Sequence, residues 1–210
     1  MKREIIITSD GSSTIHIPEW NEQYHSKHGA IQEAYHVFIK HGLKFYNESG
    51  SRSQEIKTNS EISILEIGFG TGLNAFITLL ESEKLNLNID YVGVEGYPIS
   101  TREVEQLNYT AQLGAETRDS LFKSLHLNPW ESKHKLTAQF SLTKQQKLFS
   151  EIDDCESYDI IFFDAFGARV QPELWTEAIF SIMYQALKSG GVLVTYSAKG
   201  SVRRAMQSVG

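Results

Sequence analysis

The sequence predicts an α/β domain built around a doubly wound, mostly parallel sheet. Short, densely apolar runs at Ile62–Ile67, Ile89–Val94 and Asp159–Phe163 alternate with segments of helical periodicity. Apolar runs of this length are typical of strands buried on both faces, and strand–helix alternation is typical of parallel sheets with right-handed crossovers. A length of 210 residues suits one such domain together with an N-terminal extension.

Residues 1–60 are expected to form that extension and to pack on the core. Ile5–Thr8 and Thr14–Ile17 are β-prone runs on either side of Asp10-Gly11, a pattern that predicts a β-hairpin. From Gly29 to about Phe45, apolar residues recur with helical spacing. The extension is therefore predicted to contain a hairpin followed by one helix.

The core domain is expected over residues 61–210, after a linker at Asn47–Glu61 that is rich in Ser, Asn, Gly and charge. Within the core, further strands are predicted at Ala138–Leu142 and Val192–Tyr196, and helices at Leu73–Leu80, Ser100–Leu113, Pro172–Leu187 and Val202–Ser208, the last capped by Ser201. Glu116–Gln139 has no clear periodicity.

Composition excludes several classes of protein. No run approaches the roughly 20 apolar residues of a membrane helix, and the apolar run near the N-terminus is too short for a signal peptide. The lone cysteine, Cys155, cannot form an internal disulfide, and the scattered histidines give no metal-ligand spacing. We therefore expect a cytoplasmic protein with no metal site and no membrane association.

A glycine-rich turn, Glu66 to Asn74, follows the first core strand. Glycine allows a tight turn and close approach of a ligand, and amides at a helix start favour an anionic group. A dinucleotide fingerprint needs glycine where Leu73 stands, whereas E-x-G-x-G-x-G is typical of S-adenosylmethionine sites. We therefore expect a Rossmann-like fold that binds this cofactor through Glu66, Gly68, Gly70, Thr71, Gly72 and Asn74. A purely structural turn and a nicotinamide-dependent oxidoreductase are the alternatives.

Three acidic residues at strand ends carry the expected chemistry. A buried carboxylate is costly unless paired, so Glu66 is expected to meet the cofactor's amino group, or else to bond only to loop amides. Glu95, about 20 positions beyond the turn, can accept both ribose hydroxyls or cap its own loop. Asp164 ends a strand at the sheet edge where ligands bind, so it can orient a substrate amine and accept its proton, or cap the next turn.

A compact basic group follows the last strand: Lys199, Arg203 and Arg204. These side chains could bind backbone phosphates, or they could be the solvated start of a helix. The net charge of −6 is unlike that of tight, nonspecific nucleic-acid binders. Any contact with a nucleic acid is therefore expected to be local and of modest affinity.

Four sequence blocks together resemble the methyltransferase domain of the MnmC family, bifunctional enzymes of tRNA wobble-uridine modification. The blocks are Tyr24-His25-Ser26 with Gly29 and Glu33; the glycine-rich turn; Phe163-Asp164-Ala165-Phe166 with Pro172-Glu173-Leu174-Trp175; and Gly190–Tyr196 with Val202-Arg203-Arg204. The glycine block is generic, whereas the last two are more specific. The resemblance implies methylation of the exocyclic amine of 5-aminomethyl-2-thiouridine in tRNA, with S-adenosylmethionine as cofactor.

The resemblance also implies roles for single residues. It makes Asp164 the residue that meets the amine, Tyr24 and Ser26 part of the site wall, and Phe166 a substrate contact beside the basic group. The family often continues D-A-F-A-P, but this chain has Gly167, Ala168 and Arg169.

The resemblance also has implications for which domains and strands this chain contains. A chain of this length has no room for the family's FAD oxidase domain, so a stand-alone methyltransferase or a fragment is expected. Sheets of this type usually end in an antiparallel pair of strands, which are expected to be missing here. A methyltransferase for a small-molecule amine and a non-catalytic nucleoside-binding module are the alternatives.

Overall fold

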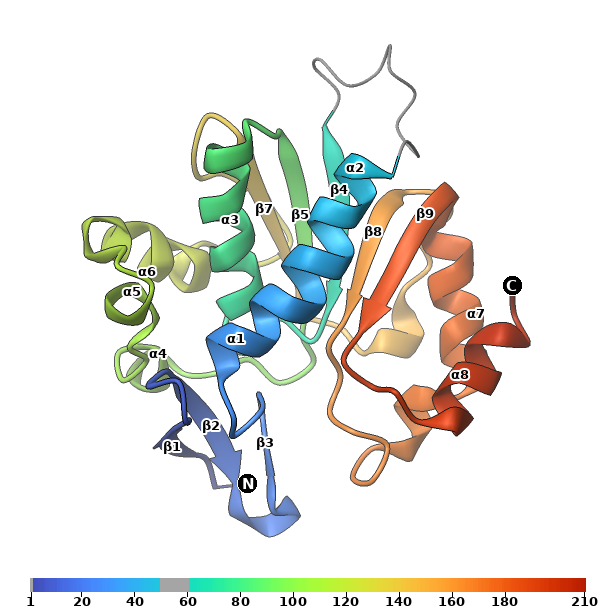
Figure 1. Ribbon diagram of the computed structural model, residues 1–210, viewed down its shortest axis with the longest axis horizontal. Helices are drawn as coiled ribbons and strands as arrows, with labels where there is room; N and C mark the ends of the chain where they lie inside the picture. The colour runs from blue at the N-terminus through green and yellow to red at the C-terminus, as the bar shows by residue number, and fades with distance from the viewer. Residues whose placement is uncertain (1, 50–60) are drawn as a thin grey trace.

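The computed structural model describes residues 2–49 and 61–210 (Figure 1). Most of the linker expected over Asn47–Glu61 lies outside the described residues.

The core is a six-stranded sheet of order β6-β7-β5-β4-β8-β9. Its strands are β4 (Ile62–Ile67), β5 (Ile89–Val94), β6 (Lys133–Lys135), β7 (Phe140–Gln145), β8 (Tyr158–Phe163) and β9 (Leu187–Thr195). Neighbouring strands are parallel except β6, which pairs antiparallel with β7. The predicted α/β class with a mostly parallel sheet is confirmed.

Helices cover both faces of this sheet (Figure 1). They are α1 (Ala30–Ala34), α2 (Phe45–Glu48), α3 (Leu73–Leu85), α4 (Thr101–Val104), α5 (Tyr109–Gln112), α6 (Asp119–Leu127), α7 (Glu177–Ala186) and α8 (Gly200–Gln207), and the π-helical η2 (Tyr35–Lys44) joins α1 to α2. On β8, Ile160 and Phe162 face the core under α1, η2 and α3, whereas Ile161 and Phe163 face the core under α7 and α8. This two-residue alternation explains why Ile160–Phe163 is apolar throughout.

The N-terminal extension contains the predicted hairpin. β1 (Glu4–Ile7) pairs antiparallel with β2 (Ser13–Ile17), and the short β3 (Glu22–Gln23) adds a third strand after the 3₁₀ turn η1 (Pro18–Trp20). Asp10, in the hairpin turn, accepts a 3.0 Å hydrogen bond from the Gln32 amide at the start of α1. The hairpin therefore fixes where the following helix begins.

Several predicted boundaries were wrong. The helix expected over Ser100–Leu113 is two short helices, α4 and α5, although Ser100 forms the expected capping box with Glu103. Pro172 opens a 3₁₀ turn, η5 (Pro172–Trp175), and α7 starts only after Thr176, whose hydroxyl caps it. The last helix is preceded by Lys199 rather than capped by Ser201.

The stretch without periodicity, Glu116–Gln139, contains the 3₁₀ turn η3 (Glu116–Arg118), α6 and β6. Strand β9 begins five residues before the predicted Val192, because a register shift against β8 carries the pairing past Gly190, where φ is +77°. β9 is an edge strand of the described part of the sheet, and the antiparallel pair lies at the opposite edge. The expected absence of further strands after β9 stays a prediction.

Candidate active site

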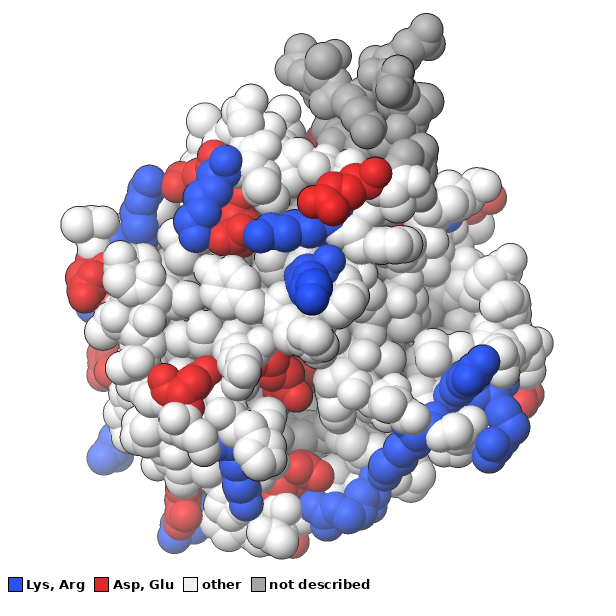
Figure 2. Space-filling view, viewed as in Figure 1, with Lys and Arg blue, Asp and Glu red and all other residues white. Residues whose placement is uncertain are grey.

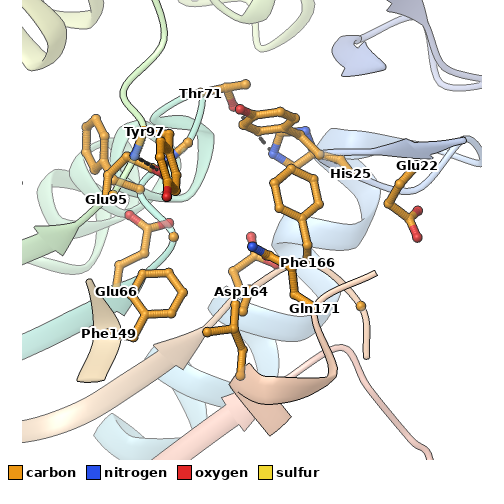
Figure 3. Close-up of a pocket in the computed structure, with 18 of the residues that line it drawn as sticks. Glu22, His25, Glu66, Thr71, Glu95, Tyr97, Phe149, Asp164, Phe166 and Gln171 are labelled. Carbon is orange, nitrogen blue, oxygen red and sulfur yellow. Dashed lines mark hydrogen bonds between the residues drawn. The ribbon is translucent and has the colours of Figure 1, made fainter. Parts of the chain in front are cut away.

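A cavity of about 660 Å³ opens where β4, β5 and β8 end, and the N-terminal extension closes it from the other side (Figure 3). Ten of the predicted site residues line it: Tyr24, Ser26, Glu66, Gly68, Gly70, Thr71, Asn74, Glu95, Asp164 and Phe166. Gly72 does not line this cavity, and neither do Lys199, Arg203 and Arg204. The fold thus brings together residues that span 143 positions of the sequence, from Tyr24 to Phe166.

The glycine turn requires a residue without a Cβ atom at two positions. Gly68 has φ of +91°, and a Cβ there would lie 2.7 Å from the Asp164 carbonyl oxygen. Gly70 has φ of +47°, and its Cβ would lie 3.1 Å from the Tyr24 ring. Glycine therefore lets the turn sit against both β8 and the extension. Gly72 precedes α3 and faces His126 instead of the cavity.

Asn74 joins two carboxylates at the end of the sheet. Its Nδ2 donates to Glu66 Oε1 at 3.0 Å and to Asp164 Oδ2 at 2.8 Å. Burial, and then the charge of Asp164, raises the pKa of Glu66 well above its ordinary value. Burial, and then the charge of Glu33, raises the pKa of Asp164 to about 8, although the hydrogen bond from Asn74 opposes this. Asp164 keeps partial exposure, through the cavity.

This carboxylate pair lacks a cation. Within residues 2–49 and 61–210, no lysine or arginine forms an ion pair with Glu66 or Asp164. Glu66 Oε2 and Asn74 Oδ1 are buried without a hydrogen-bond partner in that part of the chain. An ammonium group could donate to both atoms and offset the charge. This pair of acceptors therefore fits the amino group of S-adenosylmethionine.

Glu95 caps two segments of backbone. Its Oε2 accepts from the Gly70 amide at 2.9 Å, and its Oε1 accepts from the Tyr97 amide at 2.8 Å. Each carboxylate oxygen can accept a second hydrogen bond, so the cap and a contact with two ribose hydroxyls are compatible. Glu95 thus holds the turn in place and still faces the cavity.

The extension contributes an aromatic wall. The Tyr24 ring packs edge-on against Phe166 with centroids 4.9 Å apart, and Trp20 packs against the same ring at 5.5 Å. The Arg3 guanidinium lies 5.9 Å from the Tyr24 ring centroid and donates to the Tyr97 carbonyl at 2.7 Å. The sequence analysis missed Arg3 and Trp20, because no motif or strand end marks them.

Thr71 is held from behind the turn. Its hydroxyl accepts from the Tyr109 hydroxyl at 3.0 Å and lies 3.4 Å from His25 Nε2. His25 is buried, Thr14 lies 3.0 Å from its other ring nitrogen, and burial lowers its pKa to about 4. The Thr71 hydroxyl therefore anchors the turn to the extension, and the Thr71 carbonyl lies 3.1 Å from His126 Nε2, so the Thr71 amide is what remains for a ligand.

The predicted basic group is spread over α8 and the residue before it. Lys199, Arg203 and Arg204 are exposed, whereas Val202 and Ala205 on the same helix are buried. Figure 2 shows basic side chains running over this side of the molecule. The group is therefore a surface feature outside the cavity.

Residues 2–49 and 61–210 lack two kinds of feature. No group of three His, Cys, Asp or Glu side chains there could hold a metal ion. No helix there is long and apolar enough to cross a membrane.

Comparisons with known proteins agree with this geometry. A family model described as S-adenosyl-L-methionine-dependent methyltransferase matches residues 115–210. The tRNA 5-methylaminomethyl-2-thiouridine biosynthesis bifunctional protein MnmC of Hydrogenovibrio crunogenus is 26% identical over 91% of this chain and 29% of its own length. The MnmC protein of Pseudomonas entomophila is 25% identical over 96% of this chain and 31% of its own length. The chain thus spans less than a third of these curated relatives.

A solved structure supports the same family. The crystal structure of MNMC2 from Aquifex aeolicus superposes with a TM-score of 0.77 at 26% identity, covering 100% of this chain and 64% of that one. The match includes the extension as well as the core, because it covers the whole chain. Together with the family model and the curated relatives, it supports an S-adenosyl-L-methionine-dependent methyltransferase domain that is similar to that of MnmC proteins.

Proposed function

We propose that this domain methylates the exocyclic primary amine of 5-aminomethyl-2-thiouridine at the wobble position of tRNA. The observation that carries the proposal is Asp164, a carboxylate at the cavity floor that is bonded to Asn74 and has no cationic partner among the described residues. A protonated amine is the substrate group that such a carboxylate would bind. The names of the curated relatives support the choice of nucleoside.

The cofactor would be held by residues on three strand ends. Glu66 Oε2 and Asn74 Oδ1 would accept hydrogen bonds from its amino group, and Glu95 would accept from its ribose hydroxyls. The Gly68, Phe69, Gly70 and Gly72 amides already donate to protein oxygens, so the Thr71 amide is the one in the turn that would face its carboxylate. When bound, S-adenosylmethionine supplies an electrophilic methyl group on a sulfonium.

Asp164 would prepare the nucleophile. An aliphatic amine is mostly protonated at neutral pH, and only the neutral form can attack a methyl carbon. With a pKa near 8 before ligands bind, Asp164 can exchange a proton with an amine in the neutral range. The hydrogen bond from Asn74 fixes the carboxylate, so the amine is oriented as well as deprotonated.

Phe166, Tyr24 and Trp20 would contact the nucleobase that carries the amine. Flipped bases are commonly recognised by stacking on aromatic side chains. Lys199, Arg203 and Arg204 would bind tRNA phosphates outside the cavity. A tRNA substrate would also support a cytoplasmic location.

The test is methyl transfer from labelled S-adenosylmethionine to tRNA from cells that lack this modification step. Label recovered in the wobble nucleoside supports the proposal. Transfer to a small-molecule amine but not to tRNA would favour the second candidate, which the net charge of −6 and the absence of basic α8 residues from the cavity support. Cofactor binding with no transfer to either would leave a nucleoside-binding role.

A further inference from the structure

Glu33 is a further carboxylate that lines the active-site cavity, in addition to Glu66, Glu95 and Asp164. The sequence alone assigned it no role. It lies on α1, and its Oε2 accepts a 2.8 Å hydrogen bond from the Ser26 amide. No residue of the described chain donates to Oε1, and none forms an ion pair with it. Burial raises the pKa of Glu33. One oxygen of the Glu33 carboxylate is therefore bonded to the extension, and the other can accept from a ligand in the cavity.

The position of Glu33 is fixed by the hairpin turn. Asp10 accepts from the Gln32 amide, and a Cβ on Gly29 would lie 2.5 Å from the Asp10 carboxylate. The chain can therefore enter α1 against Asp10 only with glycine at position 29. This packing aims the first turn of α1, and Glu33 with it, at the cavity from the extension side.

Glu33 and Asp164 both line the cavity, Glu33 from α1 and Asp164 from the end of β8. The Glu33 charge contributes, after burial, to the raised pKa of Asp164. The other titratable groups around the pair are Glu66 beyond Asn74, Tyr196 after β9 and Glu22 on β3, and the charges of Asp164, Glu22 and Glu33 add to burial in raising the pKa of Tyr196. None of these neighbours is a cation.

The cavity thus holds three carboxylates without a cationic partner among the described residues: Glu66, which is buried, and Glu33 and Asp164, which are partly buried. The cofactor's amino group would meet Glu66, as argued above. We propose that Glu33 and Asp164 together form the site for the substrate's protonated amine, and that one of the two carboxylates takes the proton released before methyl transfer. This inference rests on the proposed function, because it assumes that an amine is the methyl acceptor.

Two carboxylates balance the charges through the whole reaction. The incoming ammonium gives one proton to a carboxylate and keeps its electron pair. The neutral nitrogen then forms a bond to the methyl carbon as the carbon–sulfur bond breaks and its electron pair stays on sulfur. The secondary ammonium product faces the remaining carboxylate, while the new carboxylic acid returns its proton to water at the cavity mouth. One proton is released in each turnover.

Glu33→Gln and Glu33→Asp separate this role from a structural one. Glutamine keeps the size of the side chain and an oxygen acceptor for the Ser26 amide, but it removes the charge. Aspartate keeps the charge and shortens the reach. With tRNA that lacks the methyl group, we expect E33Q to lower kcat/KM about 10- to 100-fold and E33D to retain more activity than E33Q. S-adenosylmethionine affinity, measured by calorimetry, is expected to be unchanged in both variants.

The pH profile gives the readout that a structural role would not move. Removal of the Glu33 charge lowers the pKa of Asp164, so the acidic limb of kcat/KM shifts to lower pH in E33Q. A kcat/KM and a pH profile equal to those of the wild type would overturn the proposal and leave Glu33 only as the acceptor for Ser26.

A second measurement needs no substrate. The carboxyl ¹³C signal of Asp164, assigned by its loss in Asp164→Asn, can be titrated by NMR in the wild type and in E33Q. A lower pKa in E33Q supports the coupled pair even if the wild type transfers no methyl group to tRNA, in which case the proposed function alone fails. An unchanged pKa overturns the pair whatever the substrate.

Discussion

Strand β8 has one aspartate near its beginning and another just after its end, and the two carboxylates differ in how many protein groups donate hydrogen bonds to them. Asp159 accepts hydrogen bonds from the Tyr46 hydroxyl at 2.8 Å, the Ser63 amide at 2.8 Å and the Lys188 ammonium at 2.9 Å. Among the described residues, only Asn74 donates to the Asp164 side chain, which faces a cavity. A carboxylate saturated by the protein can only stabilise the fold, whereas one left short of partners can serve a ligand.

The two aspartates also differ in their effect on the stability of the fold. Lys188 supplies the opposite charge that Asp159 needs, so this end of β8 is stable as it stands. Burial without a cation raises the pKa of Asp164 to about 8, so ionising it in the empty protein opposes folding. Functional sites commonly keep such locally unfavourable groups because the ligand, rather than the protein, completes them.

The largest effect is expected from Asp164→Asn. Loss of the proton acceptor should lower kcat/KM for methyl transfer by about 10²- to 10⁴-fold, since this is the usual contribution of a positioned acid or base. The amide leaves the cofactor site almost intact, so S-adenosylmethionine binding should persist. Asp159→Asn is the matched control and should transfer methyl groups normally at a temperature where it is folded. Equal losses in the two variants would abolish the distinction between the two ends of β8.

The second prediction concerns the control variant, Asp159→Asn. Asp159→Asn should lower the free energy of unfolding by about 2–3 kcal/mol, because Lys188 loses its carboxylate and two hydrogen bonds to a charged group are weakened. The Lys188 side chain is 37% exposed, so the ion pair itself contributes the smaller part. Urea unfolding at pH 7 measures the change. A loss below about 0.5 kcal/mol, the usual size of a neutral surface change, would show that Asp159 is not the anchor inferred here.

The third prediction concerns pH. A carboxyl whose pKa is raised in the folded state makes stability fall as pH rises from its unfolded value toward the folded one, about 8 for Asp164. His25, with a pKa lowered to about 4, acts in the opposite sense, but only below its ordinary value of about 6.5. Between pH 6.5 and 8.5 the ligand-free protein should therefore lose Tm. The loss should shrink in Asp164→Asn, with Glu66 causing what is left; an identical slope in the variant would contradict the assignment.

The smallest effect is expected at the surface. Replacement of Arg203 and Arg204 by glutamine should weaken tRNA binding several-fold at moderate salt and reduce the salt dependence of the affinity by about two phosphate contacts. Replacement of Lys133 and Lys135 by glutamine, at the opposite edge of the sheet, also removes two positive charges and serves as the control. If both replacements have the same effect, the contribution of α8 is only that of net charge.

The two ends of β8 also show what a sequence can and cannot predict. Asp164 and Glu66 could be placed in one site, because residues that follow parallel strands meet at one edge of a sheet. The partners of Asp159 could not, because Tyr46 and Lys188 reach it from distant segments with no motif. Glu33 belongs to one of the sequence blocks, but its role could not be assigned, because that role depends on the angle at which the extension meets the core. Short elements such as α6 were missed because their periodicity is too brief to read.

Within the extension, His25 contacts Thr71 and Arg3 bonds to the Tyr97 backbone, so the N-terminal sheet is tied directly to the turn and loop that would hold the cofactor. Local opening of β1–β3 would therefore dismantle the binding site while the core stays folded. Cofactor binding should in turn slow hydrogen exchange in amides of β2, about 50 residues away in the sequence from the glycine turn. Hydrogen-exchange protection in the extension should therefore report whether the cofactor is bound, and it should not depend on the stability of the core.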